Sequence, residues 1–184
     1  MSFISNNEWH LLLLIGIYTG LRLGDCCRLD WTQVNLAAGV IQVVPRKTRR
    51  HHQRMVTIPI HPVLGEALAG DGAAGVRALP SGSVLPGIAE KYGRARWRVS
   101  HELAKIFRTA GITTSVWIEG RRHRTPEATF HSLRHTFVSF AANAGVPLHI
   151  VQSIVGHEST AMTRHYYHEN LDALKGAVAA IPTL

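Results

Sequence analysis

The sequence predicts a mainly α-helical domain with a small antiparallel β-sheet, from two kinds of pattern. Several long segments repeat apolar side chains at helical spacing and end at a glycine or a proline. Two shorter segments in the first third of the chain are rich in Val and Ile, which is typical of strands. A length of 184 residues is that of a single domain whose core needs neither disulfides nor metal ions.

Local signals define the predicted elements of the first half. Ser5, with Glu8 three positions later, has the capping-box pattern that opens a helix, and Gly20 ends this helix. Pro62 lies in the first turn of a later helix, where its missing N–H is tolerated. After the first helix, the predicted elements are a helix over 21–29, strands over 35–45 and 55–60, and a helix over 61–69.

Glycines and prolines divide the second half. The stretch 70–87 is rich in Gly, Pro and Ser and is predicted to be a surface loop. The polar, Arg-rich segment 113–127 is compatible with a loop or a hairpin, and both interpretations stay open. Gly111 and Gly145 each end a helix. The predicted helices run over 97–110, 131–144, 147–154 and 160–179.

Charge and cysteine content narrow the partner and the compartment. Lys and Arg number 20 against 12 Asp and Glu, and a net charge of +8 suits a polyanionic partner, although many basic proteins bind none. Cys26 and Cys27 are adjacent and are the only cysteines, so we expect a reduced, cytoplasmic protein. The apolar run 11–18 is shorter than the roughly 20 residues that a membrane span needs. No membrane segment is therefore expected.

Four short motifs follow one another along about 150 residues. They are Thr-Gly-Leu-Arg-Leu-Gly-Asp at 19–25, Arg-Lys-Thr at 46–48, His-Ser-Leu-Arg-His at 131–135, and Gly156-His157 with Tyr166 nine residues further on. Each motif alone is a weak signal, because such short motifs also occur by chance. Their shared order and spacing are a specific signal. Together they resemble the catalytic domain of tyrosine recombinases, the phage integrase family.

The resemblance implies the DNA breaking-rejoining fold and one reaction. A tyrosine attacks a DNA phosphodiester and forms a 3′-phosphotyrosine intermediate with a free 5′ hydroxyl, and the hydroxyl of a second strand reverses the step. No metal ion or other cofactor is implied. The positions that match the family's catalytic residues are Arg22, Lys47, His131, Arg134, His157 and Tyr166.

The cationic residues have roles implied by the resemblance. Arg22 and Arg134 match arginines that hold the non-bridging phosphate oxygens, a task suited to a planar guanidinium. Asp25 matches an acidic position that would orient Arg22, and the alternative is an ordinary surface ion pair between the two. Lys47 matches the general acid for the 5′ hydroxyl, and the alternative is a solvated hairpin residue.

The histidines and the nucleophile are assigned in the same way. His131 matches a histidine that assists proton transfer, with a helix cap or a core histidine as the alternative. It lies one helical turn from Arg134, so both side chains are expected to reach one phosphate. His157 matches a residue that contacts a phosphate oxygen. Tyr167 would point about 100° away from Tyr166 on a helix, and the distance from His157 selects Tyr166.

A zinc site is the competing interpretation of the third motif. His131 and His135 have the spacing of two ligands on a zinc helix, but Ser132 stands where such a helix has glutamate. No third ligand is indicated, so no metal is expected.

Clusters of arginine predict the surface that contacts double-stranded DNA at attachment or recombination sites. We expect a homo-oligomer, a tetramer, on DNA and a monomer in isolation. Trp97 and Trp117 lie near such clusters, but core packing is the commoner role of tryptophan. The predicted DNA-binding residues are Arg46, Arg49, Arg50, Arg54, Arg121 and Arg122.

The predicted function is that of a site-specific DNA recombinase or integrase of a mobile element. Residues 1–184 are expected to form one catalytic domain without the N-terminal core-binding domain of the family. Residues 169–184 are expected to form a C-terminal helix or tail that packs in trans or on its own chain. Two alternatives are a type IB topoisomerase, and a non-catalytic regulator in which the helix pair 146–154 acts as a helix-turn-helix.

Overall fold

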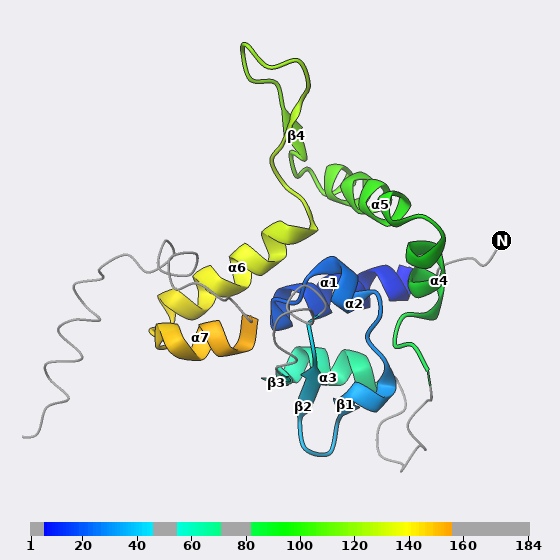
Figure 1. The fold of residues 1–184 in the computed structure, drawn as a ribbon, viewed down its shortest axis with the longest axis vertical. Helices are drawn as coiled ribbons and strands as arrows, with labels where there is room; N and C mark the ends of the chain where they lie inside the picture. The colour runs from blue at the N-terminus through cyan, green and yellow to red at the C-terminus, as the bar shows by residue number, and fades with distance from the viewer. Residues whose placement is uncertain (1–5, 46–54, 71–81, 156–184) are drawn as a thin grey trace, which may run out of the picture.

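The computed structural model describes residues 6–45, 55–70 and 82–155, and helices make up most of them (Figure 1). The short 3₁₀ helix η1 (Trp31–Gln33) precedes the first strand. The α-helices are α1 (Asn6–Thr19), α2 (Leu23–Cys26), α3 (Pro62–Ala69), α4 (Pro86–Arg94), α5 (Arg96–Thr109), α6 (Phe130–Asn143) and α7 (Leu148–Val155).

Two small antiparallel sheets complete the fold. The first has the order β1-β2-β3, and Ile41 pairs with Val34 on one side and with Ile58 on the other. The second is a two-stranded hairpin. The strands are β1 (Val34–Asn35), β2 (Val40–Val43), β3 (Val56–Pro59), β4 (Ser115–Val116) and β5 (Thr125–Pro126). The predicted mainly α fold with a small antiparallel sheet is therefore confirmed.

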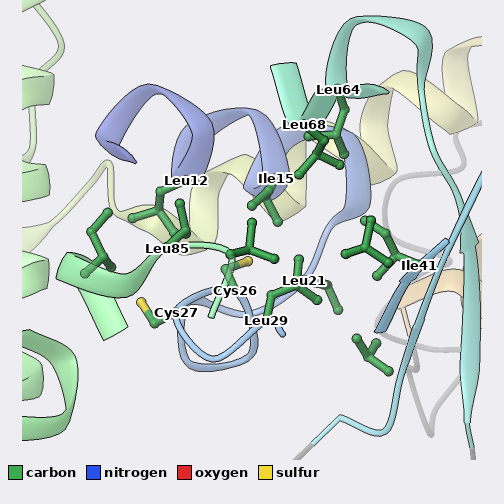
Figure 2. Packing of buried hydrophobic residues seen from close by; sticks show 14 of the residues in the cluster. Leu12, Ile15, Leu21, Cys26, Cys27, Leu29, Ile41, Leu64, Leu68 and Leu85 are labelled. Atoms are coloured by element: carbon green, nitrogen blue, oxygen red, sulfur yellow. The ribbon is translucent and has the colours of Figure 1, made fainter. Parts of the chain in front are cut away.

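Helix α1 is the centre of the domain, because α3, α4 and α6 all pack against it (Figure 1). Its run of leucine and isoleucine is apolar around most of the helix, as expected for a helix with neighbours on several sides. Leu12 and Ile15 are completely buried. Figure 2 shows them beside Leu29 and Leu85, which come from distant parts of the chain. This core fixes the end of α1, from which the first motif begins.

The two adjacent cysteines belong to this core. Cys26 and Cys27 are buried and carry free thiols (Figure 2). Burial raises the pKa of the Cys27 thiol to about 12 and raises that of Cys26 well above its usual range. Both thiols are therefore neutral at physiological pH and act as small apolar side chains.

Three predictions of secondary structure need correction. The single strand expected over 35–45 is the end of β1, a turn closed by the N–H of Gly39, and β2. The helix expected over 21–29 is the single turn α2, after which Leu29 is already buried in the core. The loop expected over 70–87 ends earlier, because Pro86 is the first residue of α4. Proline at a first helical position is a local signal for this start. Residues 71–81, the basic hairpin 46–54 and the helix expected over 160–179 lie outside the described residues.

A contact between distant residues also stabilises the start of α4. The carboxylate of Glu8 accepts hydrogen bonds from the backbone N–H groups of Gly87 (3.2 Å) and Ile88 (2.9 Å). A carboxylate is favourable at a helix N-terminus, where the backbone N–H groups have no helical partners. The predicted partner of Glu8, Ser5, lies outside the described residues. The structure thus uses Glu8 to join α1 to α4.

The contact between α1 and α6 gives a test of the packing. A Cβ atom at Gly16 would lie 2.6 Å from Cζ of Phe130 and 2.9 Å from Cδ1 of Leu133. We expect Gly16→Ala to lower the free energy of unfolding by about 1–3 kcal/mol, because the added methyl group overpacks this contact. Urea denaturation measures the change.

A matched substitution is Gly65→Ala in α3, where the nearest atom, Cγ2 of Ile60, lies 3.5 Å away. We expect this variant to be more stable than the wild type by about 0.4–1 kcal/mol, because alanine restricts the unfolded chain. Equal stability changes in the two variants would contradict the packing described.

Candidate active site

The first motif turns the chain sharply at the end of α1. The N–H of Gly20 donates to the carbonyl of Gly16 (3.1 Å), and Gly20 has a φ of 64°, in the left-handed region that favours glycine. A Cβ atom at Gly20 would lie 2.8 Å from Cδ1 of Phe137 in α6. The hydroxyl of Thr19 accepts the N–H of Leu21 (3.2 Å). The motif therefore forms a tight turn closely packed on α6.

Arg22 follows this turn as the residue that precedes α2. Its carbonyl accepts the N–H groups of Asp25 (2.8 Å) and Cys26 (3.0 Å), so its backbone is fixed by the first turn of α2. The side chain is half-buried and lines a cleft. Asp25 lies in α2, close enough in sequence to orient Arg22. That contact between the two side chains stays a prediction.

His131 lies in the first turn of α6. Thr129 caps this helix, because its hydroxyl accepts the N–H of His131 (3.2 Å) and its own N–H donates to the hydroxyl of Ser132 (3.1 Å). His131 is exposed and its ring meets the ring of His135 edge to face, with centroids 4.7 Å apart. The alternatives of a capping or core histidine are therefore wrong, since Thr129 is the cap and His131 is exposed.

Arg22 and His131 lie on one cleft of about 550 Å³, although their motifs are far apart in the sequence. Arg108 of α5 lines the same cleft, and no Asp or Glu is among its described lining residues. Two guanidinium groups and an imidazole therefore give this cleft a cationic lining, which favours an anion such as phosphate. The remaining lining residues are Leu23, Gly24, Ser100, Leu103, Ala104, Phe107, Thr114, Ser115, Pro126, Ala128, Thr129 and Phe130.

Sequence reasoning missed the contribution of α5 and β4 to this cleft. Arg108 lies in the last turn of α5, and its Nη1 is 3.4 Å from the hydroxyl of Thr114. Ser100 and Ser115 add hydroxyl groups to the lining. The sequence shows that these residues are basic or polar, but only the fold brings them to the same cleft as Arg22.

Arg134 has a different place from the one expected. It is 2% exposed, and it does not belong to the cleft lining. Its Nη1 donates to the carbonyl of Gly20 (2.7 Å) and its Nη2 to the carbonyl of Val155 (2.6 Å). Burial of a guanidinium is costly without such charge-assisted hydrogen bonds. Arg134 thus joins the first motif, α6 and the end of α7, immediately before the Gly156-His157 motif.

His135 follows Arg134 in α6 and has a shifted pKa. Partial burial, and secondarily the charge of Arg134, lowers the pKa of His135 below its usual value. His131 and Arg134 are thus one turn apart in α6, but one faces the cleft and the other faces the protein interior. The expectation that both reach one phosphate is not met in this arrangement.

The remaining predicted residues divide into two groups. Arg121 and Arg122 are exposed on the hairpin formed by β4 and β5. The others lie outside the described residues: Lys47, His157, Tyr166, Arg46, Arg49, Arg50 and Arg54. Their roles stay predictions.

Two further findings concern only residues 6–45, 55–70 and 82–155. In these ranges, no helix combines the length and hydropathy required to cross a membrane. Nor do they contain a cluster of three or more His, Cys, Asp or Glu side chains arranged to hold a metal ion.

Comparison with known proteins decides the family. Residues 4–172 match the model of the phage integrase family. The chain belongs to the phage integrase family. Within it, the tyrosine recombinase XerC of Halalkalibacterium halodurans is 28% identical over 160 residues, which cover 85% of this chain and 48% of that protein. The chain spans less than half the length of curated relatives such as this XerC and the integrase of Salmonella phage P22.

Solved structures of integrases share the fold. The catalytic domain of bacteriophage HP1 integrase has a TM-score of 0.62 and 23% identity, over 95% of this chain and 83% of that one. The Tn1549 transposon integrase in complex with transposon right end DNA has a TM-score of 0.64 and 19% identity, over 94% and 58% of the two chains. The predicted fold of a tyrosine recombinase catalytic domain is confirmed.

The anion site can be tested with inorganic phosphate. At a phosphate concentration ten times its dissociation constant, we expect the wild-type protein to gain about 1.4 kcal/mol of stability over sodium chloride of equal ionic strength. Arg22→Ala should gain less, because it removes one of the cations that line the cleft. Thermal unfolding in the two salts measures the difference.

The matched control is Arg94→Ala, which removes an exposed arginine that is paired with Glu90 in α4. Phosphate also stabilises proteins in general by exclusion from their surface, and this effect is common to all variants. Equal gains in the wild type and both variants would show that the cleft does not bind phosphate.

Proposed function

We propose that this chain is the catalytic part of a site-specific DNA recombinase or integrase, which cleaves and rejoins DNA strands through a 3′-phosphotyrosine intermediate. The observation that supports this most is the shared cleft of Arg22 and His131, which come from two separate motifs. The cleft offers cations for a phosphate and an imidazole for a proton. Membership of the phage integrase family gives the reaction class.

The proposed nucleophile is Tyr166. A tyrosine with an ordinary pKa near 10 is ionised in about one molecule in a thousand at pH 7, which corresponds to about 4 kcal/mol. Cations around the phosphate offset this deficit by stabilising both the phenolate and the charge on the pentacoordinate phosphorus. Arg22 and a protonated Lys47 are the proposed sources of that charge.

The proposed cleavage of the phosphodiester requires no cofactor. The phenolate oxygen of Tyr166 forms a bond to phosphorus, and the bond to the 5′ oxygen breaks. The leaving oxygen keeps the electron pair and takes a proton from Lys47, with His131 assisting proton transfer and His157 contacting a phosphate oxygen. The hydroxyl of a second strand then attacks the phosphotyrosine and restores the tyrosine.

The proposed role of Arg134 as a phosphate ligand requires a change of structure. A guanidinium has five N–H donors, and two of its nitrogens already bind the carbonyls of Gly20 and Val155. Because the residue is 2% exposed, a phosphate can reach it only if DNA binding uncovers it. In the arrangement described here, Arg134 acts as a positioning residue.

We further propose double-stranded DNA attachment or recombination sites as the substrate and a tetramer as the active assembly. The net charge of +8 supports a polyanionic partner. The solved structures of the similar Tn1549 integrase and XerH recombinase contain DNA, which is consistent with this substrate. A cytoplasmic location, an origin in a mobile element and a trans-packing tail over 169–184 belong to the same proposal.

Covalent trapping tests the function. We would incubate the protein in EDTA with a library of nicked duplexes of random central sequence, in which the short fragment that carries the free 5′ hydroxyl diffuses away after cleavage. We expect a protein–DNA adduct that resists denaturation, because the loss of the fragment prevents religation. Sequencing of the trapped DNA would identify the cleaved site.

Neighbouring tyrosines supply the control. Tyr166→Phe should form no adduct, whereas Tyr167→Phe should retain it, since only the hydroxyl of Tyr166 attacks phosphorus. The absence of any adduct with the wild type, or an adduct that persists in Tyr166→Phe, would refute the proposed function.

A further inference from the structure

The hairpin formed by β4 and β5 projects from the body of the domain beyond α5 and α6 (Figure 1). Its tip is a defined turn, because the N–H of Arg121 donates to the carbonyl of Ile118 (3.1 Å) and Gly120 has a φ of 80°. A positive φ at the third position is the geometry of a type II turn and favours glycine. At its base, the N–H of Glu127 donates to the carbonyl of Thr114 (3.0 Å), which extends the pairing of the strands.

Two arginines brace the hairpin. Arg124 reaches across the strands, where its Nε donates to the hydroxyl of Ser115 (3.0 Å) and its Nη2 to the carbonyl of Ser115 (2.7 Å). Arg121 donates from Nη1 to the hydroxyl of Thr125 (3.3 Å). These polar contacts, rather than buried apolar side chains, hold the two strands of the hairpin together.

The other side chains of the tip face solvent. Arg122 and His123 are exposed and, within the described part of the chain, take part in no hydrogen bond or ion pair. Trp117 is 64% exposed. Residues 117–124 contain three arginines and a single acidic residue, Glu119. A projecting cationic tip with an exposed indole has the composition of a nucleic-acid contact, since arginine binds phosphate and tryptophan can pack on sugar or base.

The base of the hairpin connects this tip to the cleft. Ser115 and Pro126, which pair with each other across the strands, line the same cleft as Arg22 and His131. At about 3.3 Å per residue, the four residues from the strand to the turn extend about 13 Å. Phosphates of one strand are spaced about 3.4 Å along the DNA axis. A duplex with one phosphate in the cleft therefore has several others within reach of the tip.

We propose that this hairpin is an arm that binds the phosphate backbone of the DNA beside the cleaved phosphate, with Arg122 as its main contact. The inference rests on the proposed function for the identity of the partner. Arg124 and Arg121 position the arm, and Arg122 neutralises a phosphate that the cleft does not contact. Duplex DNA fits the tip better than a protein surface does, because charge dominates the exposed side chains.

Salt dependence of binding tests the arm. We would measure the dissociation constant of the full chain for a random-sequence duplex by fluorescence anisotropy over a series of salt concentrations. Each neutralised phosphate contributes about 0.9 to the slope of log affinity against log salt. We expect Arg122→Gln to lower this slope by about 0.9. The double variant Arg22→Ala with Arg122→Gln should lower it by about 1.8, because the two arginines contact different phosphates.

The control is Arg94→Gln, which removes one exposed positive charge from α4, at the far end of α5 from the hairpin (Figure 1). Its slope should match that of the wild type, and thermal unfolding of both single variants should match as well. An unchanged slope in Arg122→Gln, or an equal loss in Arg94→Gln, would overturn the proposal. So would a change in self-association with no change in DNA affinity, which would make a second copy of the chain the partner.

Failure of this inference is distinguishable from failure of the proposed function. The slope is measured without cleavage, so a missing Tyr166 adduct leaves the DNA contact of Arg122 intact. An unchanged slope together with a normal adduct would overturn only the arm.

Discussion

The relative positions of α1, α6 and α7 depend on the hydrogen bonds that the buried guanidinium of Arg134 makes. Its hydrogen bonds to the carbonyls of Gly20 and Val155 hold together the end of α1 and the end of α7, while its own backbone belongs to α6. Leaving such a charge buried without partners would cost several kcal/mol, so these carbonyls are effectively required. Gly20 belongs to the first motif, and Val155 immediately precedes Gly156 in the sequence. Arg134 therefore positions the first motif relative to α6 and the end of α7 before any DNA is present.

The cleft follows from this arrangement. With the turn at Gly20 packed against α6, Arg22 and His131 line the same cleft, to which α5 adds Arg108. The resulting site is cationic and lined by hydroxyl groups, with apolar side chains such as Phe107 and Phe130 among its walls. The proposed phosphate would be attracted to this cleft by charge and partly shielded from water, which strengthens each hydrogen bond to it.

The sequence could predict those parts of the structure that depend on local patterns. Apolar spacing predicted α1 and α6, and the resemblance to tyrosine recombinases implied that Arg22 and His131 belong to one site. The direction of Arg134 could not be predicted, because a helical position one turn from His131 is compatible with either the cleft or the core. Its burial depends on carbonyl groups supplied by distant segments. The capping of α4 by Glu8 could not be predicted either, because it joins residues that are far apart in the sequence.

Hydrogen exchange in Arg134→Lys tests this account most directly. Lysine keeps the charge but cannot bridge the two carbonyls with a planar fork. We expect amide protection in segments 20–26 and 148–155 to fall by about 10- to 100-fold, since these segments open locally. Protection in β2 and β3 should stay unchanged, as it should throughout His135→Ala, which alters an exposed neighbour. Unchanged protection in both segments, or an equal loss across the sheet, would contradict the central role of Arg134.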